Sequence, residues 1–292
     1  MPDITVFSMD ILDLKKLSRR FSAAGIDNAK RIAEELSAHI LNCKPLEVYL
    51  PDQTFNGEQL EQLESAARRI EKGEPLQYVI GHVNFWGLKI KCDSRALIPR
   101  PETELLVEEV LCSKVWQNNP ATVVDVGTGS GCIAVTLAKQ RPDAGFKAVD
   151  ISPDALELAR ENAQAHGVDD RIFWMENHLL DRFAPESADV IVANLPYIAS
   201  EEWKKLSPAV RDFEPQTALD SGPSGMELIS ELATQARYVL VPGGMLFLEF
   251  GYDQGRMVHD CLERLGYTDI EIKHDLADLD RIAIAVNPSS AH

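Results

Sequence analysis

The fold of this chain is decided by the stretch Val123-Val124-Asp125-Val126-Gly127-Thr128-Gly129-Ser130-Gly131, in which an apolar strand pattern runs into a glycine-rich turn. A helical pattern follows, from Cys132 to about Lys139. Glycines at alternate positions let the backbone turn sharply and let a ligand approach the main chain. Taken alone, such a loop also fits a tight turn without a ligand. The residues that follow are needed to choose between the two.

A second strand pattern lies about twenty residues further on, as expected of a nucleoside-binding βαβ unit. It consists of Phe146-Lys147-Ala148-Val149 and ends in Asp150, whose carboxylate can accept both hydroxyls of a ribose. The dinucleotide fingerprint G-x-G-x-x-G requires glycine where this chain has Cys132, and no P-loop lysine follows the loop. The spacing G-x-G-x-G is common in methyltransferases that use S-adenosylmethionine, and we expect that cofactor.

A polar loop follows another apolar run, Val190-Ile191-Val192-Ala193, which is typical of a buried parallel strand. The loop is Asn194-Leu195-Pro196-Tyr197. An asparagine oxygen can accept an N–H, proline biases the preceding residue towards extended backbone, and tyrosine offers a flat face. These properties suit an enzyme that methylates a planar nitrogen, although a strand that ends in an X-Pro turn with an Asx cap explains the four residues equally well.

Strand and helix patterns alternate after residue 100, which predicts an α/β fold with a mostly parallel sheet covered on both faces. The last two strands are separated by a short polar stretch, so that pair can be antiparallel. The expected strands lie near residues 122–126, 146–150, 171–174, 188–193, 244–250, 267–272 and 281–286, with a late helix near 225–240.

The first seventy-odd residues have helical periodicity, which predicts a small helical domain at residues 1–74. Short β-like pieces between about 75 and 99 predict a β-hairpin linker, and the catalytic domain is expected to span residues 100–292. A basic cluster lies in the first helical pattern and is either a solvated helix face or a docking patch for a partner. It comprises Lys15, Lys16, Arg19 and Arg20.

The 292-residue chain has a formal net charge of −17, of which residues 1–75 carry −3 and the remainder −14. This acidity counts against a nucleic acid as the main partner. No apolar run reaches the length of a membrane span and no signal-peptide pattern is present, so we expect a cytoplasmic protein without membrane contact. The five cysteines have no C-x-x-C spacing and no matching histidine cluster. We therefore expect buried free thiols and no metal site.

The chain resembles the protein-(glutamine) methyltransferases that modify peptide chain release factors, over nearly its full length. The resemblance implies a class I S-adenosylmethionine-dependent methyltransferase fold, Rossmann-like with a seven-stranded sheet, and a small N-terminal helical domain. We expect that domain to help dock the protein substrate, because it lies outside the cofactor fold and carries the least acidic surface. It further implies methylation of the side-chain amide nitrogen of the glutamine in a release factor's Gly-Gly-Gln motif. Besides the glycine loop, it rests on Gly73-Glu74-Pro75-Leu76-Gln77-Tyr78, Phe85-Trp86-Gly87, Ile98-Pro99-Arg100-Pro101-Glu102-Thr103-Glu104, Phe213-Glu214-Pro215 and Ala218-Leu219.

The resemblance also assigns roles to individual residues. Asp150 is expected to bind the ribose of the cofactor, and Asn177 or His178 its adenine, although this pair matches the family pattern only in part. The methionine and adenosine moieties are expected to contact Gly127, Thr128, Gly129, Ser130 and Gly131.

The substrate amide is expected to contact the polar loop. The Asn194 oxygen and the Leu195 carbonyl would accept its two N–H bonds, next to Pro196, and Tyr197 would pack on its plane; Asn194 also borders the cofactor. Leu195 departs from the family, which has proline there. Two alternatives remain open at this point: an adenine-N6 or cytosine-N4 nucleic-acid methyltransferase, which shares this type of loop, and an inactive cofactor-binding scaffold.

Overall fold

The computed structural model describes residues 11–50, 53–118 and 122–288, which form two compact units. The first unit comprises the chain up to Gly81 together with Pro208–Phe213, and the second comprises His82–Ser207 and the chain from Glu214 onward. Within the described residues, no helix is long and apolar enough to cross a membrane.

The first unit is helical, as its periodicity predicts, and its core is made by apolar side chains that recur on one face of each helix. Leu17 and Phe21 meet Leu36 and Ile70 in this core. The expectation of β-like pieces from about residue 75 is wrong for Leu76–Ile80, which form a short helix because Leu76 packs into the same core. The helices are α1 (Ile11–Ala23), α2 (Ala29–Leu41), η1 (Pro45–Tyr49), α3 (Gly57–Glu71), α4 (Leu76–Ile80) and α10 (Pro208–Arg211).

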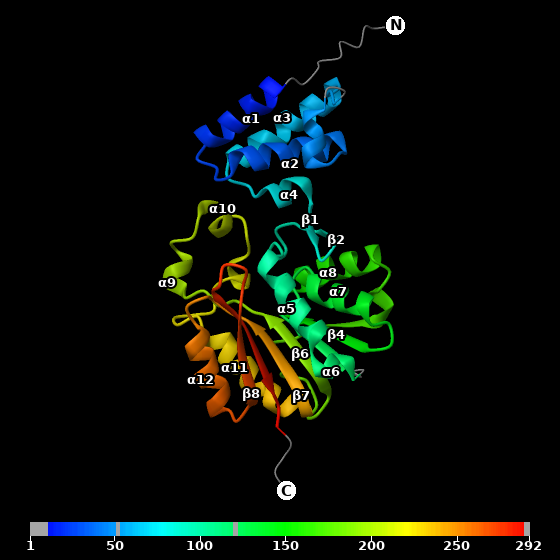
Figure 1. The fold of residues 1–292 in the computed structure, drawn as a ribbon, viewed down its shortest axis with the longest axis vertical. Helices are drawn as coiled ribbons and strands as arrows, with labels where there is room; N and C mark the ends of the chain where they lie inside the picture. The colour runs from blue at the N-terminus through cyan, green and yellow to red at the C-terminus, as the bar shows by residue number, and fades with distance from the viewer. Residues whose placement is uncertain (1–10, 51–52, 119–121, 289–292) are drawn as a thin grey trace. The chain divides into compact units, whose positions relative to one another are not determined.

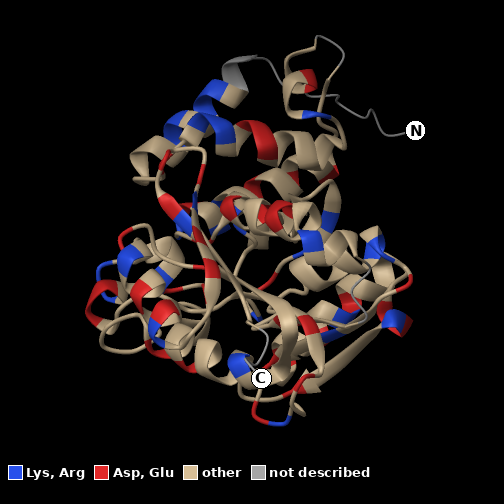
Figure 2. Ribbon diagram, turned by 60° about the horizontal axis from the view of Figure 1, so that its bottom comes forward, with Lys and Arg blue, Asp and Glu red and all other residues tan. Residues whose placement is uncertain are grey.

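Helix α1 carries the basic cluster, and its lysines and arginines colour much of that helix blue in Figure 2. Arg20 is neutralised, because its guanidinium bonds to the carboxylates of Glu64 and Glu71 at 2.7 and 2.8 Å. Lys15 and Arg19 are exposed to solvent. The cluster is therefore part ion-pair network and part open cationic surface.

The second unit contains a seven-stranded sheet of order β5-β4-β3-β6-β7-β9-β8 (Figure 1). Strands β5, β4, β3, β6 and β7 are parallel, whereas β9 runs antiparallel to both β7 and β8. The expected antiparallel pairing of the last two strands is confirmed. The strands are β3 (Thr122–Val126), β4 (Gly145–Asp150), β5 (Ile172–Glu176), β6 (Ala188–Asn194), β7 (Leu240–Glu249), β8 (Thr268–His274) and β9 (Asp280–Val286).

Helices cover both faces of this sheet because the strand side chains alternate between two apolar cores. Val124 and Ile191 face the core that α11 and α12 complete, while Val123 and Val190 face the core that α5, α6 and α7 complete. The helices are α5 (Pro101–Cys112), α6 (Lys114–Gln117), α7 (Cys132–Gln140), α8 (Pro153–Ala165), η2 (Asp169–Arg171), α9 (Ser200–Trp203), η3 (Gln216–Ala218), α11 (Glu227–Val239) and α12 (Gly255–Arg264).

All five cysteines are free thiols, but they are not all buried as expected. Cys112 is exposed near the end of α5 and Cys43 is half-buried, whereas Cys92, Cys132 and Cys261 are buried.

Chain order in the sheet reverses at β3, which has β4 on one side and β6 on the other. In open α/β sheets, a crevice for ligands forms at such a point, outside the carboxyl ends of the strands. The register aligns these ends, because Val126 pairs with Val149 of β4 and with Ala193 of β6. The next residue along each strand is Gly127, Asp150 or Asn194. The sheet thus brings the glycine loop, the predicted ribose acceptor and the polar loop to one edge.

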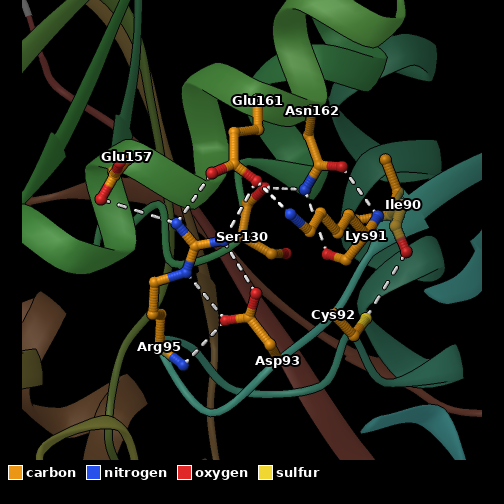
Figure 3. Close-up of polar contacts among 9 residues, drawn as sticks. All are labelled: Ile90, Lys91, Cys92, Asp93, Arg95, Ser130, Glu157, Glu161 and Asn162. Carbon is orange, nitrogen blue, oxygen red and sulfur yellow. Dashed lines mark hydrogen bonds and ion pairs between the residues drawn. The ribbon is translucent and has the colours of Figure 1, made fainter. Parts of the chain in front are cut away.

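A β-hairpin is linked to α8 and to the glycine loop by one buried asparagine (Figure 3). It consists of β1 (His82–Phe85) and β2 (Leu88–Lys91). Asn162 of α8 accepts the Lys91 N–H at 2.7 Å and donates to the Ser130 carbonyl at 2.8 Å. Beside it, Arg95 bonds to the carboxylates of Asp93 and Glu161. The end of the hairpin and the glycine loop are therefore tied to the same helix.

We expect Asn162→Leu to lower the free energy of unfolding by about 1–3 kcal/mol, because the Lys91 N–H and the carbonyls of Lys91 and Ser130 lose their side-chain partner. Chemical denaturation measures the change. Gln164→Leu, on an exposed turn of the same helix, is the control and should change stability by less than about 0.5 kcal/mol. Equal losses in the two variants would contradict the anchoring role of Asn162.

Candidate active site

A cavity of about 300 Å³ opens at the carboxyl edge of the sheet. The glycine loop, Asp150 and the start of the polar loop line it, and residues 95–100 and 215–220 contribute further lining. Among the predicted site residues, the lining includes Gly127, Thr128, Gly129, Ser130, Asp150, Asn177, His178, Asn194, Leu195 and Pro196.

Two glycines of the loop require the conformational freedom that the sequence analysis assigns to them. Gly127 has a φ of 72° and Gly131 a φ of 79°, both in the left-handed region. A Cβ on Gly127 would lie 2.7 Å from Cδ2 of Leu195, and one on Gly131 would lie 2.9 Å from the Cβ of Ala159. Gly131 is thus placed for packing against α8 and is not among the lining residues, whereas Gly127 lies directly beside the polar loop.

Asp150 borders the cavity and also holds the loops around it in place through hydrogen bonds. Its Oδ2 accepts the Gly129 N–H at 2.8 Å, and its Oδ1 accepts the Ser152 N–H at 2.9 Å. Burial raises the pKa of this carboxyl above its ordinary value. Each carboxylate oxygen can accept more than one hydrogen bond, so the group can hold the loop and a sugar hydroxyl together.

The two candidate adenine contacts differ in their surroundings. Asn177 is buried, donates its backbone N–H to the Asp150 carbonyl at 3.0 Å, and bonds through its side chain to the Leu179 carbonyl. His178 is only partly buried, and its Nδ1 lies 3.7 Å from Asp181 and 3.5 Å from Glu231. Both residues border the cavity, and Asn177 is held in place more firmly.

Asp125 is a structural residue of the site that the sequence analysis leaves without a role. Its Oδ2 accepts the Thr128 hydroxyl at 2.7 Å and the Ala134 N–H at 3.1 Å, which ties the glycine loop to the first turn of α7. Its Oδ1 is buried without a hydrogen-bond partner among the described residues. Burial raises the pKa of Asp125 to about 7. An acidic residue within an apolar strand pattern is the sequence feature that could have predicted this role.

Asn194 is oriented by a chain of polar groups. Its Nδ2 donates to Oγ1 of Thr103 at 2.9 Å, and this hydroxyl donates to Oε2 of Glu249 at 2.8 Å. No hydrogen bond to Oδ1 of Asn194 is formed within the described part of the chain, and the residue borders the cavity. The side chain thus offers an acceptor to a ligand.

The rest of the polar loop divides between the cavity and the core. Leu195 is 5% exposed and packs against the glycine loop, which gives this leucine a packing role where the family pattern has proline. Tyr197 lies outside the described cavity lining and packs against the apolar core, and burial raises its pKa to about 12. Its contact with a planar substrate stays a prediction.

An ion pair between a half-buried arginine and a buried glutamate holds two lining segments together. Glu214 accepts from the Arg100 guanidinium at 2.6 Å and from the Ile98 N–H at 3.1 Å. The neighbouring Pro99 and Pro215 border the cavity. The sequence alone does not predict this pairing, because residues more than a hundred positions apart give no local signal of contact.

Comparisons with known proteins agree with this geometry. The family models "PrmC N-terminal domain" and "Methyltransferase small domain" match residues 14–81 and 103–210. A release factor glutamine methyltransferase of Cereibacter sphaeroides is 41% identical over 93% of this chain and 96% of its own length. The chain belongs to the release factor glutamine methyltransferase family. A relative of the same name from Chlorobaculum tepidum is 37% identical over 96% of this chain and 98% of its own.

A solved structure supports the fold independently. A methyltransferase from Pyrococcus furiosus aligns with a TM-score of 0.52 at 16% identity and covers 70% of this chain and 91% of that one. With the seven-stranded sheet, this confirms the predicted class I methyltransferase fold.

We expect Asp150→Ala to weaken S-adenosylmethionine binding by about 10- to 100-fold, because hydrogen bonds to a charged acceptor contribute about 1.5–3 kcal/mol. Isothermal calorimetry measures the affinity. Asp150→Asn keeps one acceptor oxygen and should lose less. Unchanged affinity in the alanine variant would remove Asp150 from the cofactor site.

Proposed function

We propose that this protein transfers a methyl group from S-adenosylmethionine to the side-chain amide nitrogen of the glutamine in the Gly-Gly-Gln motif of peptide chain release factors. The observation that carries the proposal is the Asn194 side chain, whose free oxygen lies on the same sheet edge as the glycine loop and Asp150. Relatives that match nearly the whole chain carry the name release factor glutamine methyltransferase.

The residues of the cavity fit this cofactor. Asp150 would accept the ribose hydroxyls, Asn177 borders the space for the adenine, and the backbone of Gly127 and Gly129 leaves room for the methionine. The nearby cations do not oppose a positively charged sulfonium, because Arg95 and Arg100 are both paired with carboxylates. When bound, the cofactor supplies an electrophilic methyl group.

The polar loop supplies what a glutamine amide needs. An amide nitrogen is a weak nucleophile because its lone pair is delocalised into the carbonyl, so its orientation and the surrounding dipoles must compensate. Asn194 Oδ1 and the Leu195 carbonyl would accept its two N–H bonds, which directs the lone pair and stabilises positive charge that develops on nitrogen. In the net reaction, an N–C bond to the methyl group would form at the amide nitrogen as the bond between that methyl and the cofactor's sulfur breaks, its electron pair would stay on sulfur, and the nitrogen would release one proton.

We expect Asn194→Ala to lower the methylation rate by about 100-fold or more, the loss typical of removing one preorganised polar contact. Single-turnover assays with a release factor measure the rate, and calorimetry with the cofactor controls for folding. Near-normal turnover in this variant would contradict the proposed role of Asn194.

The same assay decides between the remaining alternatives. Methylation of an adenine- or cytosine-containing oligonucleotide in place of the release factor would establish a nucleic-acid methyltransferase. Cofactor binding without transfer to either substrate would establish an inactive scaffold. The net charge of −17 disfavours the first, and the intact acceptor on Asn194 disfavours the second.

We further propose that the N-terminal domain, residues 1–74, docks the release factor through the exposed cations of α1. Lys15 and Arg19 are solvent-exposed on a protein that is otherwise strongly acidic. Such residues attract an acidic surface of a partner and raise its association rate. The hairpin segment after Gly81 would then connect this docking domain to the catalytic domain, residues 100–292.

We expect the double variant Lys15→Glu and Arg19→Glu to raise KM for a release factor by roughly 5- to 10-fold, since each reversed surface charge weakens an attraction of about 0.2–1 kcal/mol and adds a repulsion. The affinity for cofactor should not change. Arg256→Glu with Arg264→Glu, two exposed positions on α12, makes the same charge change and is the control. Equal KM values for the two double variants would exclude this docking surface.

A further inference from the structure

Glu249 is a buried carboxylate that the proposed chemistry does not yet use. It ends β7, directly beside Asn194 in the parallel register with β6, and is 1% exposed. Burial raises its pKa to about 7, against the opposing influence of hydrogen bonds from Thr103 and Asn194. A buried acid is costly unless its hydrogen bonds are satisfied, so its place next to the polar loop requires a reason.

Thr103 connects this carboxylate to Asn194. It is 2% exposed, lies in the first turn of α5, and its Oγ1 is within hydrogen-bond distance of both side chains, at 2.9 Å from Asn194 and 2.8 Å from Glu249. A hydroxyl has a single proton, and when Glu249 is ionised it can only accept, so the proton is donated to Glu249. The hydroxyl can therefore only accept from Asn194, and the group that faces it must be the Asn194 amine.

An ionised Glu249 disfavours a flipped Asn194 carboxamide. With Glu249 ionised and Oδ1 turned towards Thr103, the one hydroxyl proton could serve only one of its two oxygen neighbours, and the other pair of oxygens would face each other without a proton in a buried place. The flipped side chain would also present N–H donors to the N–H donors of a substrate amide. Only the orientation seen here provides an acceptor at the cavity.

We propose that Thr103 and Glu249 are positioning residues that fix the Asn194 carboxamide with its oxygen towards the substrate amide. The inference rests on the proposed function and adds to it the groups that orient the acceptor. The chain of donors from Asn194 through Thr103 to Glu249 also polarises the carboxamide, because hydrogen bonds in series strengthen one another. A more negative Oδ1 stabilises a nitrogen that becomes positive during transfer.

The neighbourhood of Glu249 agrees with this role. Arg281 is a nearby cation that favours the charged carboxylate, yet its guanidinium bonds to Asp275 and to the Phe250 carbonyl. Glu102 is a nearby like charge on α5. In the described structure the hydrogen bonds on Glu249 thus come from the polar loop and α5, and not from an arginine that would make it a simple structural ion pair.

The test compares Thr103→Val with Thr103→Ser in single-turnover and steady-state assays on a release factor. The valine variant should lose at least about 10-fold in kcat, with KM and cofactor affinity within about 3-fold of wild type. The serine variant keeps the hydroxyl and should recover most of the lost rate. Thr136→Val, at a buried helical position of α7 that bonds only to its own helix, is the matched control for the substitution.

A structural readout on the full-length enzyme tests the orientation without turnover. The Asn194 side-chain NH₂ resonance, assigned by its loss in Asn194→Ala, should exchange slowly with water and should shift in Thr103→Val and in Glu249→Gln. Rapid exchange, or wild-type kcat in the valine variant, would overturn the inference, as would serine and valine variants with equal loss. A wild-type enzyme that shows slow exchange but never methylates a release factor would refute the proposed function and leave the positioning intact.

Discussion

The alignment of parallel strand ends at β3 is the constraint on which the rest of the site depends. Because Val126 pairs with both Val149 and Ala193, the next residues of three strands emerge together at one edge. Backbone pairing forms this alignment, and a shift of one residue would turn every side chain of the strand to the opposite face. The two apolar cores that cover the sheet hold the register in place.

Buried polar groups fix the positions of the loops and side chains that follow the aligned strand ends. Asp125 and Asp150 hold the glycine loop from two sides, and Asn162 ties it to the hairpin. The Thr103 hydroxyl holds Asn194 in the same way. Each of these groups makes at least one hydrogen bond within the protein, so its geometry is set before any ligand enters. Such preorganisation is what a reaction on a weak nucleophile requires.

The sequence predicts those parts of the structure that depend on local patterns. The strand at 122–126, the glycine turn and the helix after it are all encoded in neighbouring residues, and the register then places Asp150 and Asn194 together as expected. Long-range partners were not predictable in this way. Glu249 is a charged residue at the end of an apolar strand, which the sequence shows. Its hydrogen bond with Thr103 joins residues 146 positions apart, and no local pattern predicts it.

The most direct test of the account is peptide mapping by mass spectrometry of a purified release factor after incubation with this enzyme and S-adenosylmethionine. The account predicts one added methyl group, on the side chain of the glutamine in the Gly-Gly-Gln motif. A methyl group on any other residue, or an unmodified factor in the presence of an enzyme that binds the cofactor, would contradict it.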